Sequence, residues 1–246
     1  GGKGLNQSIA LAKAGVPVYH AGIVGTDGDI LLEACKEAGV NTKYIRRLPV
    51  KGGHTMIQVD KNAQNCIILY GGTNQMQTKE FVDEVLADFG EGDYLILQNE
   101  INMLDYIIDQ AYEKKMKIVM NPSPFDDKLS TCDLSKVYLF LVNEIEGEQI
   151  TGCKDKDQIL DAMAAKFPNA RFVLTLGSDG AVYYDGKEKV FQDIFKVKAV
   201  DTTAAGDTFT GYFIAAVIEG RSIQEALRMA AKASSIAVSR PGATPS

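Results

Sequence analysis

The sequence is poor in several residue types that often define a functional site by themselves. It contains no tryptophan, 2 histidines and 4 cysteines, and the cysteines are widely spaced with no C-x-x-C pair. This usage argues against a metal or redox centre and favours free thiols in a reducing, cytoplasmic compartment. We assign no role to His20 or His54, because a lone histidine beside an apolar stretch is usually a packing residue.

Long apolar runs and a strong charge of either sign are also absent. No stretch reaches the roughly 18 apolar residues that cross a bilayer, and no basic segment followed by an apolar one indicates a signal peptide. The formal net charge is -6 in a chain with 24% charged residues, which argues against a broad nucleic-acid-binding surface. The sequence therefore predicts neither a membrane nor a nucleic-acid partner.

The chain does contain enough apolar material for a sizeable core. Its 246 residues are 46% hydrophobic, which predicts a single domain over residues 1–246. Continuously apolar strands alternate with helices, a pattern typical of an α/β fold whose mostly parallel sheet is covered on both faces. Apolar stretches at 54–60 and 65–70 flank a short polar segment and predict a hairpin. We expect residues 52–72 to form a small β lid.

Polar or small residues follow several of the predicted strands. In parallel sheets, ligands bind beyond the carboxyl ends of the strands. The strand ends in question are residues 98–100, 121–123, 143–144, 177–180 and 201–203. Together they predict a crevice along one edge of the sheet.

The stretch 200–220, VDTTAAGDTFTGYFIAAVIEG, is the most informative. Three small residues at 204–206 precede Asp207 and a long apolar helix. Small side chains leave the first N–H groups of that helix uncovered, so that an anion can bind there with help from the helix dipole. Asp207 beside the anion could accept the proton of an attacking hydroxyl, whereas the structural alternative is a simple helix cap. The small residues and the polar strand ends favour the catalytic interpretation.

Two further stretches have both a structural and a functional interpretation. Asn143 and Glu146 are either a helix cap and a first-turn carboxylate, or a pair in which Glu146 orients water around Mg²⁺. The glycine-rich turn at 177–180 fits any hairpin, and it would equally let the backbone approach nucleotide phosphates.

The opening stretch GGKGLNQ matches neither of two common cofactor motifs. A Walker A loop needs Ser or Thr after its lysine, but Lys3 is followed by Gly4, and a dinucleotide fingerprint needs glycine where Gln7 stands. The remaining interpretation is a close approach of the backbone to a small ligand, with Lys3 and Asn6 as donors to hydroxyl groups.

Taken in order, these motifs resemble the ribokinase-like family of carbohydrate kinases. GGKGLNQ resembles the family's first signature and DTTAAGDTF its second, and LQNE, NPSP, NEIEGEQITG, TLGSDG and SRPGATPS extend the resemblance along the chain. The resemblance implies a three-layer α/β/α fold with a small lid. It also implies transfer of the γ-phosphoryl group of ATP to a sugar hydroxyl, with ribose and ribose 5-phosphate as expected substrate and product. Alternatives are a kinase for fructose, a keto-deoxy sugar acid or a nucleoside, and a non-catalytic sugar- or nucleotide-binding protein.

The resemblance also implies roles for individual residues. Asp207 matches the general base, and Ala205 and Gly206 match an anion hole. Implied sugar-binding residues are Gly2, Lys3, Gly4, Leu5, Asn6, Glu100 and Asp207. Implied ATP-binding residues are Asn143, Thr175, Leu176, Gly177, Ser178, Asp179, Gly180, Gly206 and Asp207. Glu146 is implied to bind Mg²⁺ through water, and an activating monovalent cation, K⁺, is implied at Asp201, Thr203, Ala237, Arg240, Gly242 and Ser246.

The chain departs from the family pattern at three points. Ala204 stands where many relatives carry glycine, and Ala231 lies near a position where His or Asn often contacts adenine. Family members also begin with a central strand that carries a sugar-binding Asp, followed by further lid strands, and they end with a helix. We expect these terminal segments to be missing here and the lid to be partial. Beyond sugar and ATP, the expected partner is a second copy, in a homodimer formed through the lid.

Overall fold

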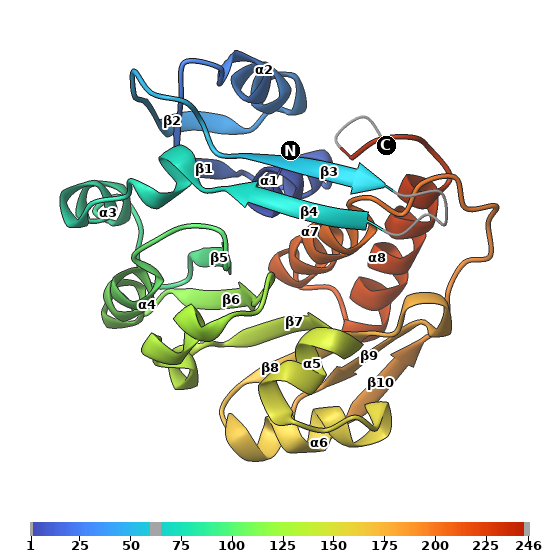
Figure 1. Ribbon diagram of the computed structural model, residues 1–246. Helices are drawn as coiled ribbons and strands as arrows, with labels where there is room; N and C mark the ends of the chain where they lie inside the picture. Colours follow the sequence, from blue (N-terminus) through green and yellow to red (C-terminus); the bar gives the residue numbers. More distant parts are fainter. Residues whose placement is uncertain (1, 60–64, 244–246) are drawn as a thin grey trace.

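The computed structural model describes residues 2–59 and 65–243, and its centre is a six-stranded sheet in the order β10–β9–β8–β7–β6–β5 (Figure 1). Neighbours from β5 to β8 are parallel, and β9 and β10 extend the sheet in antiparallel fashion. The strands are β5 (Tyr94–Gln98), β6 (Lys117–Asn121), β7 (Leu139–Asn143), β8 (Arg171–Thr175), β9 (Ala181–Tyr184) and β10 (Lys189–Gln192). The prediction of an α/β fold with a mostly parallel sheet is confirmed.

Helices cover both faces of this sheet, and alternate side chains of each strand enter opposite cores. Phe140 faces one core while its neighbours Leu139 and Leu141 face the other. The Phe140 face packs against α3 (Lys79–Leu86), α4 (Leu104–Glu113), α5 (Glu144–Thr151) and α6 (Lys156–Lys166). The opposite face packs against α1 (Lys3–Lys13), α7 (Ala205–Ile218) and α8 (Ile223–Val238). These three layers position the helix ends that build the site.

Local capping explains where two of these helices begin. The Ser222 side chain accepts from the backbone N–H of Glu225, and the Glu225 carboxylate accepts from the Ser222 N–H, so a capping box begins α8. Asn143 and Glu146 form the same reciprocal pair at the start of α5.

A separate parallel pair, β1 (Tyr19–Val24) and β2 (Asn41–Arg47), is connected by α2 (Asp29–Ala38). The apolar stretch 16–25 predicts a buried strand, and this prediction is wrong: of β1, Ile23 alone is buried, and His20 is half-buried. The physical reason is that β1 pairs only with β2 and leaves its other edge unpaired in the described structure.

The sequence of residues 190–200 predicts one long strand, and the structure differs from this prediction. The strand ends at Gln192, and the Asp193 carboxylate accepts from the backbone of Ile194, which turns the chain. Further on, the Val200 N–H donates to the carbonyl of Val238 in α8 instead of to a neighbouring strand.

The predicted hairpin is confirmed as β3 (His54–Val59) and β4 (Asn65–Tyr70), an antiparallel pair that forms its own sheet. The chain returns through the 3-10 turn η1 (Gly72–Gln75), where the carbonyl of Asn74 accepts from the N–H of Asn102. Other short 3-10 turns are η2 (Asp127–Thr131), η3 (Leu134–Lys136) and η4 (Gly177–Asp179).

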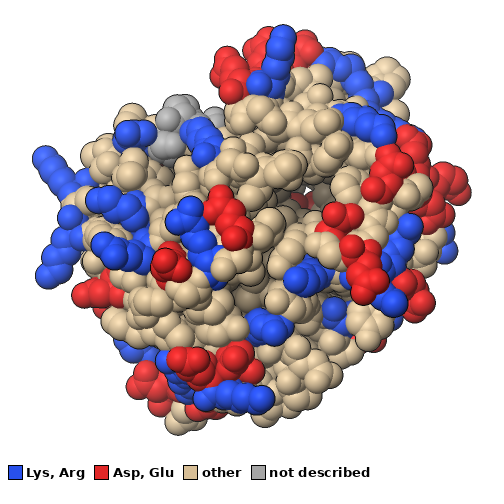
Figure 2. Space-filling view, turned by 180° about the vertical axis from the view of Figure 1, so that it is seen from behind, with Lys and Arg blue, Asp and Glu red and all other residues tan. Residues whose placement is uncertain are grey.

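The surface carries charges of both signs. On the face shown in Figure 2, Lys and Arg side chains are interspersed with Asp and Glu and separated by uncharged atoms. Within residues 2–59 and 65–243, no helix combines the length and the hydropathy needed to cross a membrane.

The close crossing of α1 and α7 generates the first prediction. A Cβ at Gly211 would lie 2.5 Å from Ala10 Cβ and 2.9 Å from the Leu11 backbone nitrogen. Gly211→Ala should therefore lower the free energy of unfolding by about 1–3 kcal/mol, although alanine normally stabilises a helix interior by about 1 kcal/mol. Urea denaturation measures this change. The control Gly90→Ala meets nothing within 4 Å and should stay within about 0.5 kcal/mol of the parent; equal effects at both positions would contradict the packing argument.

His20 generates the second prediction, because burial lowers its pKa from 6.5 to about 4. Its Nδ1 lies 2.8 Å from the Ser8 hydroxyl, which joins β1 to α1. Between pH 6.5 and about 4 the unfolded chain binds a proton at this residue that the folded chain does not. The stability contributed by neutral His20 is therefore present above pH 6.5 and lost as the pH falls toward 4. Over this pH range, the free energy of unfolding of the parent should fall more than that of His20→Gln. Parallel curves of this free energy against pH would contradict the role given to His20.

Candidate active site

Asp207 lies in the first turn of α7 and is 5% exposed. Its Oδ2 accepts from Asn6 Nδ2 at 2.9 Å and its Oδ1 from Gln7 Nε2 at 3.0 Å. The Lys3 ammonium lies 3.8 Å from Oδ1. All three partners belong to the first turns of α1, so the two sequence signatures meet although they lie at opposite ends of the chain. The surroundings suit an ionised carboxylate, because two amide donors and a cation face it.

The start of α7 is open on the side where Gly206 is exposed. Ala204 precedes the helix with φ +60°, the left-handed conformation that glycine adopts most easily, and no side chain caps the helix. The Ala205 N–H donates to the carbonyl of Thr202, but no described acceptor takes the N–H of Gly206 or Asp207. A Cβ built on Gly206 would meet nothing within 4 Å. This arrangement leaves two helix N–H groups for an anion.

Glu100 holds the opening loop in place. Its carboxylate accepts from the backbone N–H groups of Lys3 and Gly4, each at 3.2 Å, at the N-terminus of α1. A negative charge is favourable there because it faces the positive end of the helix dipole. Gly2 adopts φ +112° immediately before this turn. Glu100 thus lies at the predicted sugar-binding loop, bound to its backbone.

Leu5 is placed differently from the other predicted sugar-binding residues. Its side chain is buried with Ile9, Cys35 and Val40 in a small core between α1, α2 and β2. Its side chain also lines the apolar cavity described below and is not among the described partners of Asp207.

Strands β7 and β8 bring part of the predicted nucleotide site together. Asn143 and Thr175 are paired neighbours at the carboxyl ends of these strands. The turn η4 follows, with Ser178 exposed and Asp179 paired to Lys156 at 2.8 Å. Gly180 has φ +95°, and a Cβ there would lie 2.3 Å from the Gln192 carbonyl oxygen, so this position requires glycine. No hydrogen bond or ion pair joins this turn to Asp207 among the residues described.

Leu176 and Gly177 directly follow β8, whereas Ala231 lies in α8. Leu176 donates its N–H to the carbonyl of Gly180 at 2.8 Å, which closes the turn around Gly177. Ala231 is partly buried against the core formed with α7 and α8.

Glu146 is 6% exposed and completes the capping box of α5. Its Oε2 accepts from the Asn143 N–H at 3.1 Å and lies 3.4 Å from Asn121 Nδ2. No described donor reaches its other oxygen, Oε1, so this oxygen fits the role of an acceptor for water on Mg²⁺. Groups of three or more His, Cys, Asp or Glu side chains arranged to hold a metal are absent from the described part of the chain.

The residues predicted for a monovalent cation come from two segments that lie side by side. Asp201 accepts from the N–H of Thr203 at 2.8 Å and from the N–H of Gly242 at 3.0 Å. A hydrogen bond from the Thr203 side chain, together with these two backbone bonds, lowers the pKa of Asp201. The Arg240 N–H donates to the carbonyl of Ala237, which extends the end of α8. Ser246 lies outside the described residues.

Sequence reasoning missed a buried group of amides behind Asp207. Gln7 is 1% exposed and contacts Asp207, Asn121 and Gln98 through its side chain. A signal was available for two of the three, since Gln98 and Asn121 end predicted strands. Gln7 carries no such signal, because its position matters only once α1 is packed against the sheet.

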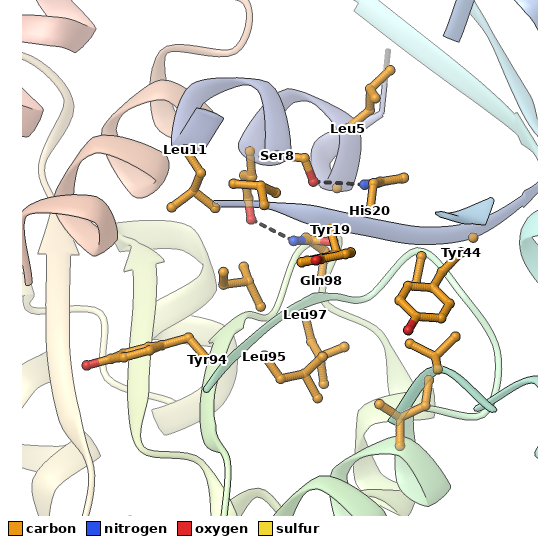
Figure 3. Close-up of a pocket in the computed structure, with 18 of the residues that line it drawn as sticks. Leu5, Ser8, Leu11, Tyr19, His20, Tyr44, Tyr94, Leu95, Leu97 and Gln98 are labelled. Atoms are coloured by element: carbon orange, nitrogen blue, oxygen red, sulfur yellow. Dashed lines mark hydrogen bonds between the residues drawn. The ribbon is translucent and has the colours of Figure 1, made fainter. Parts of the chain in front are cut away.

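A cavity of about 710 Å³ lies beside this site, between β1 and the edge strand β5 (Figure 3). Its walls are mainly apolar and include Leu11, Leu95 and Leu97, whereas Gly2, Gly4 and Glu100 are among its polar lining. Lys3, Asn6 and Asp207 are not part of the lining. This cavity is therefore adjacent to the cluster of ionisable groups and not identical with it.

Known proteins of one family match this chain along its whole length. The family model of pfkB family carbohydrate kinases matches residues 1–246. The ribokinase of Haemophilus influenzae is 33% identical, over 99% of this chain and 82% of the relative. The ribokinase of Schizosaccharomyces pombe is 34% identical, over 100% of this chain and 82% of the relative.

Solved structures show the same fold. The ribokinase of Arabidopsis thaliana complexed with ribose and ATP has a TM-score of 0.86 and 30% identity, covering 100% of this chain and 83% of that one. The ribokinase of Cryptococcus neoformans in complex with ADP also has a TM-score of 0.86 at 30% identity, covering 100% of this chain and 84% of that one. The chain belongs to the pfkB family of carbohydrate kinases.

Proposed function

We propose that this chain transfers the γ-phosphoryl group of ATP to the primary hydroxyl of ribose, with Asp207 as the general base. The observation that carries this proposal is the buried Asp207 carboxylate at the open N-terminus of α7, held by donors from the opening loop. The choice of ribose is supported by relatives at 33–34% identity that are ribokinases. A structure of one such relative, at 30% identity, holds ribose and ATP.

The sugar would bind at the loop Gly2–Asn6, beside Asp207. Lys3 and Asn6 can donate to sugar hydroxyls, and Glu100 keeps the loop backbone in register through its two bonds to α1. Asp207 accepts the proton of the attacking hydroxyl. The N–H groups of Gly206 and Asp207 stabilise the negative charge of the phosphoryl group during transfer.

The nucleotide would bind along the ends of β7 and β8, at Asn143 and residues 175–180. When bound, Mg²⁺ neutralises charge on the phosphates, and Glu146 would orient its water through the free Oε1. Asp201 orders two backbone segments, 200–203 and 238–242, whose carbonyl oxygens could hold K⁺.

We also propose a homodimer formed through the hairpin, with action in the cytoplasm. Met56, Ile68 and Leu69 are exposed apolar residues on β3 and β4, and exposed apolar groups of this kind favour association. The free thiols of Cys35, Cys132 and Cys153 suit a reducing compartment.

The substrate is tested by coupling ADP release to a signal in the presence of MgATP and K⁺. The panel comprises ribose, 2-deoxyribose, fructose and inosine. We expect kcat/KM for ribose to exceed that for each other substrate at least about 10-fold. 2-Deoxyribose would leave a hydrogen-bonding group of the site unpaired, and fructose and inosine differ from ribose in size and shape. A preference for another substrate would keep the kinase chemistry and overturn the choice of ribose, and no turnover on any of them would overturn both.

Asp207→Asn tests the base. It should lower kcat about 100-fold or more, because asparagine cannot accept the proton, while the affinity for ATP stays within a few-fold of the parent. Steady-state kinetics and ATP titration measure the two quantities. Asp157→Asn is the matched control, since it removes a carboxylate from the first turn of α6 and should leave kcat unchanged. If Asp207→Asn keeps turnover within a few-fold, Asp207 is not the base.

A further inference from the structure

The side chain of Gln7 occupies the junction of a buried hydrogen-bond chain. Its Oε1 accepts from Gln98 Nε2 at 2.6 Å, and its Nε2 donates to Asp207 Oδ1 at 3.0 Å and to Asn121 Oδ1 at 3.1 Å. Figure 3 shows the first of these bonds as a dashed line at Gln98. Both hydrogens of the amide and its oxygen are thus engaged.

The chain continues beyond Asn121 to the second carboxylate. Asn121 Nδ2 donates to the carbonyl of Leu141 at 3.0 Å and lies 3.4 Å from Glu146 Oε2. Because Asn121 Oδ1 faces the Gln7 donor, its Nδ2 must face Leu141 and Glu146. Two neutral amides therefore connect Asp207 on α7 to Glu146 on α5, and the donors point away from the Gln7 amide nitrogen toward both carboxylates.

The donors and acceptors around Gln7 fix which way its amide group is turned. Turning it over would place its oxygen against the carboxylate of Asp207 and its nitrogen against the donor of Gln98. Such a reversal would leave buried groups unpaired, which is costly in a site excluded from water. Gln7 is 1% exposed, so water does not substitute for these partners.

We propose that Gln7 is a positioning residue that sets the orientation of the Asp207 carboxylate and links it through Asn121 to Glu146. This inference rests on the proposed function of Asp207 as general base. Gln7 holds Oδ1 while Asn6 holds Oδ2, so the two hydrogen bonds restrain rotation of the carboxylate about its last bond. Gln7 acts through Asp207 and touches neither proposed substrate.

Gln7→Met tests the proposal, because methionine has a similar length but forms none of the three bonds. We expect kcat to fall about 10-fold to 100-fold, the size of effect that a misplaced catalytic group produces. KM for sugar and KM for ATP should stay within about 3-fold, since ground-state binding does not use Gln7. The kcat of Gln7→Glu should fall as far as that of Gln7→Met, because the substitution sets a carboxylate oxygen against the carboxylate of Asp207.

The matched control is Gln77→Met. Gln77 is also a buried glutamine, 5% exposed, and its Nε2 has no partner among the described residues. Gln77→Met should change the free energy of unfolding no more than Gln7→Met does. It should leave kcat at the parental value. A loss of kcat in Gln77→Met equal to that in Gln7→Met would assign the effect to packing and overturn the proposal.

The decisive measurement repeats Gln7→Met in the Asp207→Asn background, by single-turnover kinetics. If Gln7 acts through Asp207, its replacement should change the residual rate less than 2-fold there. An unchanged 10-fold loss would show that Gln7 acts by another route. If Asp207→Asn alone remains active, Asp207 is not the base and the proposed function fails. If Asp207→Asn is inactive while Gln7→Met keeps full kcat, the proposal for Gln7 fails and the base stands.

Discussion

The site depends on one constraint, the burial of the Asp207 carboxylate where the N-termini of α1 and α7 meet. Removing a charged group from water is costly unless donors replace its hydration. Here the donors are Asn6 and Gln7, which come from the other end of the chain. They reach Asp207 only because α1 and α7 cross closely, and Gly211 permits that crossing since a Cβ there would overlap Ala10. The geometry of the charged cluster therefore requires the close packing of α1 against α7.

The contrast between α5 and α7 shows how the fold separates structural helix starts from one that can bind an anion. Both helices begin beyond the carboxyl end of the sheet. At α5, the reciprocal bonds of Asn143 and Glu146 satisfy two orphan backbone groups. At α7, no side chain caps the helix and Ala204 takes a left-handed conformation that costs an alanine of order 1 kcal/mol. The free N–H groups at the start of α7 are what an anion site needs, and the strained Ala204 before them is a feature that often accompanies functional sites.

Much of this arrangement could be predicted because it depends on local patterns. The small residues before Asp207 and the polar ends of the parallel strands are visible in the sequence, and topology then brings them to one edge. The Gln7 chain could not be predicted, since it joins residues 91, 114 and 200 positions apart. Within the sequence Gln7 counts only as the residue that breaks a dinucleotide motif. The exposure of β1 was missed for a related reason: an apolar strand does not reveal how many of its edges are paired.

Glu146 illustrates why the sequence left two interpretations of one residue open. A helix cap and a ligand for hydrated Mg²⁺ look like alternatives when only the N-x-x-E spacing is known. In the structure they use different atoms, because Oε2 serves the capping box and the bond to Asn121 while Oε1 has no described donor. The cap fixes the carboxylate, and a fixed carboxylate can orient water with little further loss of freedom. The cap would thus support the role proposed for Glu146 toward Mg²⁺. In the same way, the bonds of Asp201 to Thr203 and Gly242 order two backbone segments and would support the proposed cation site.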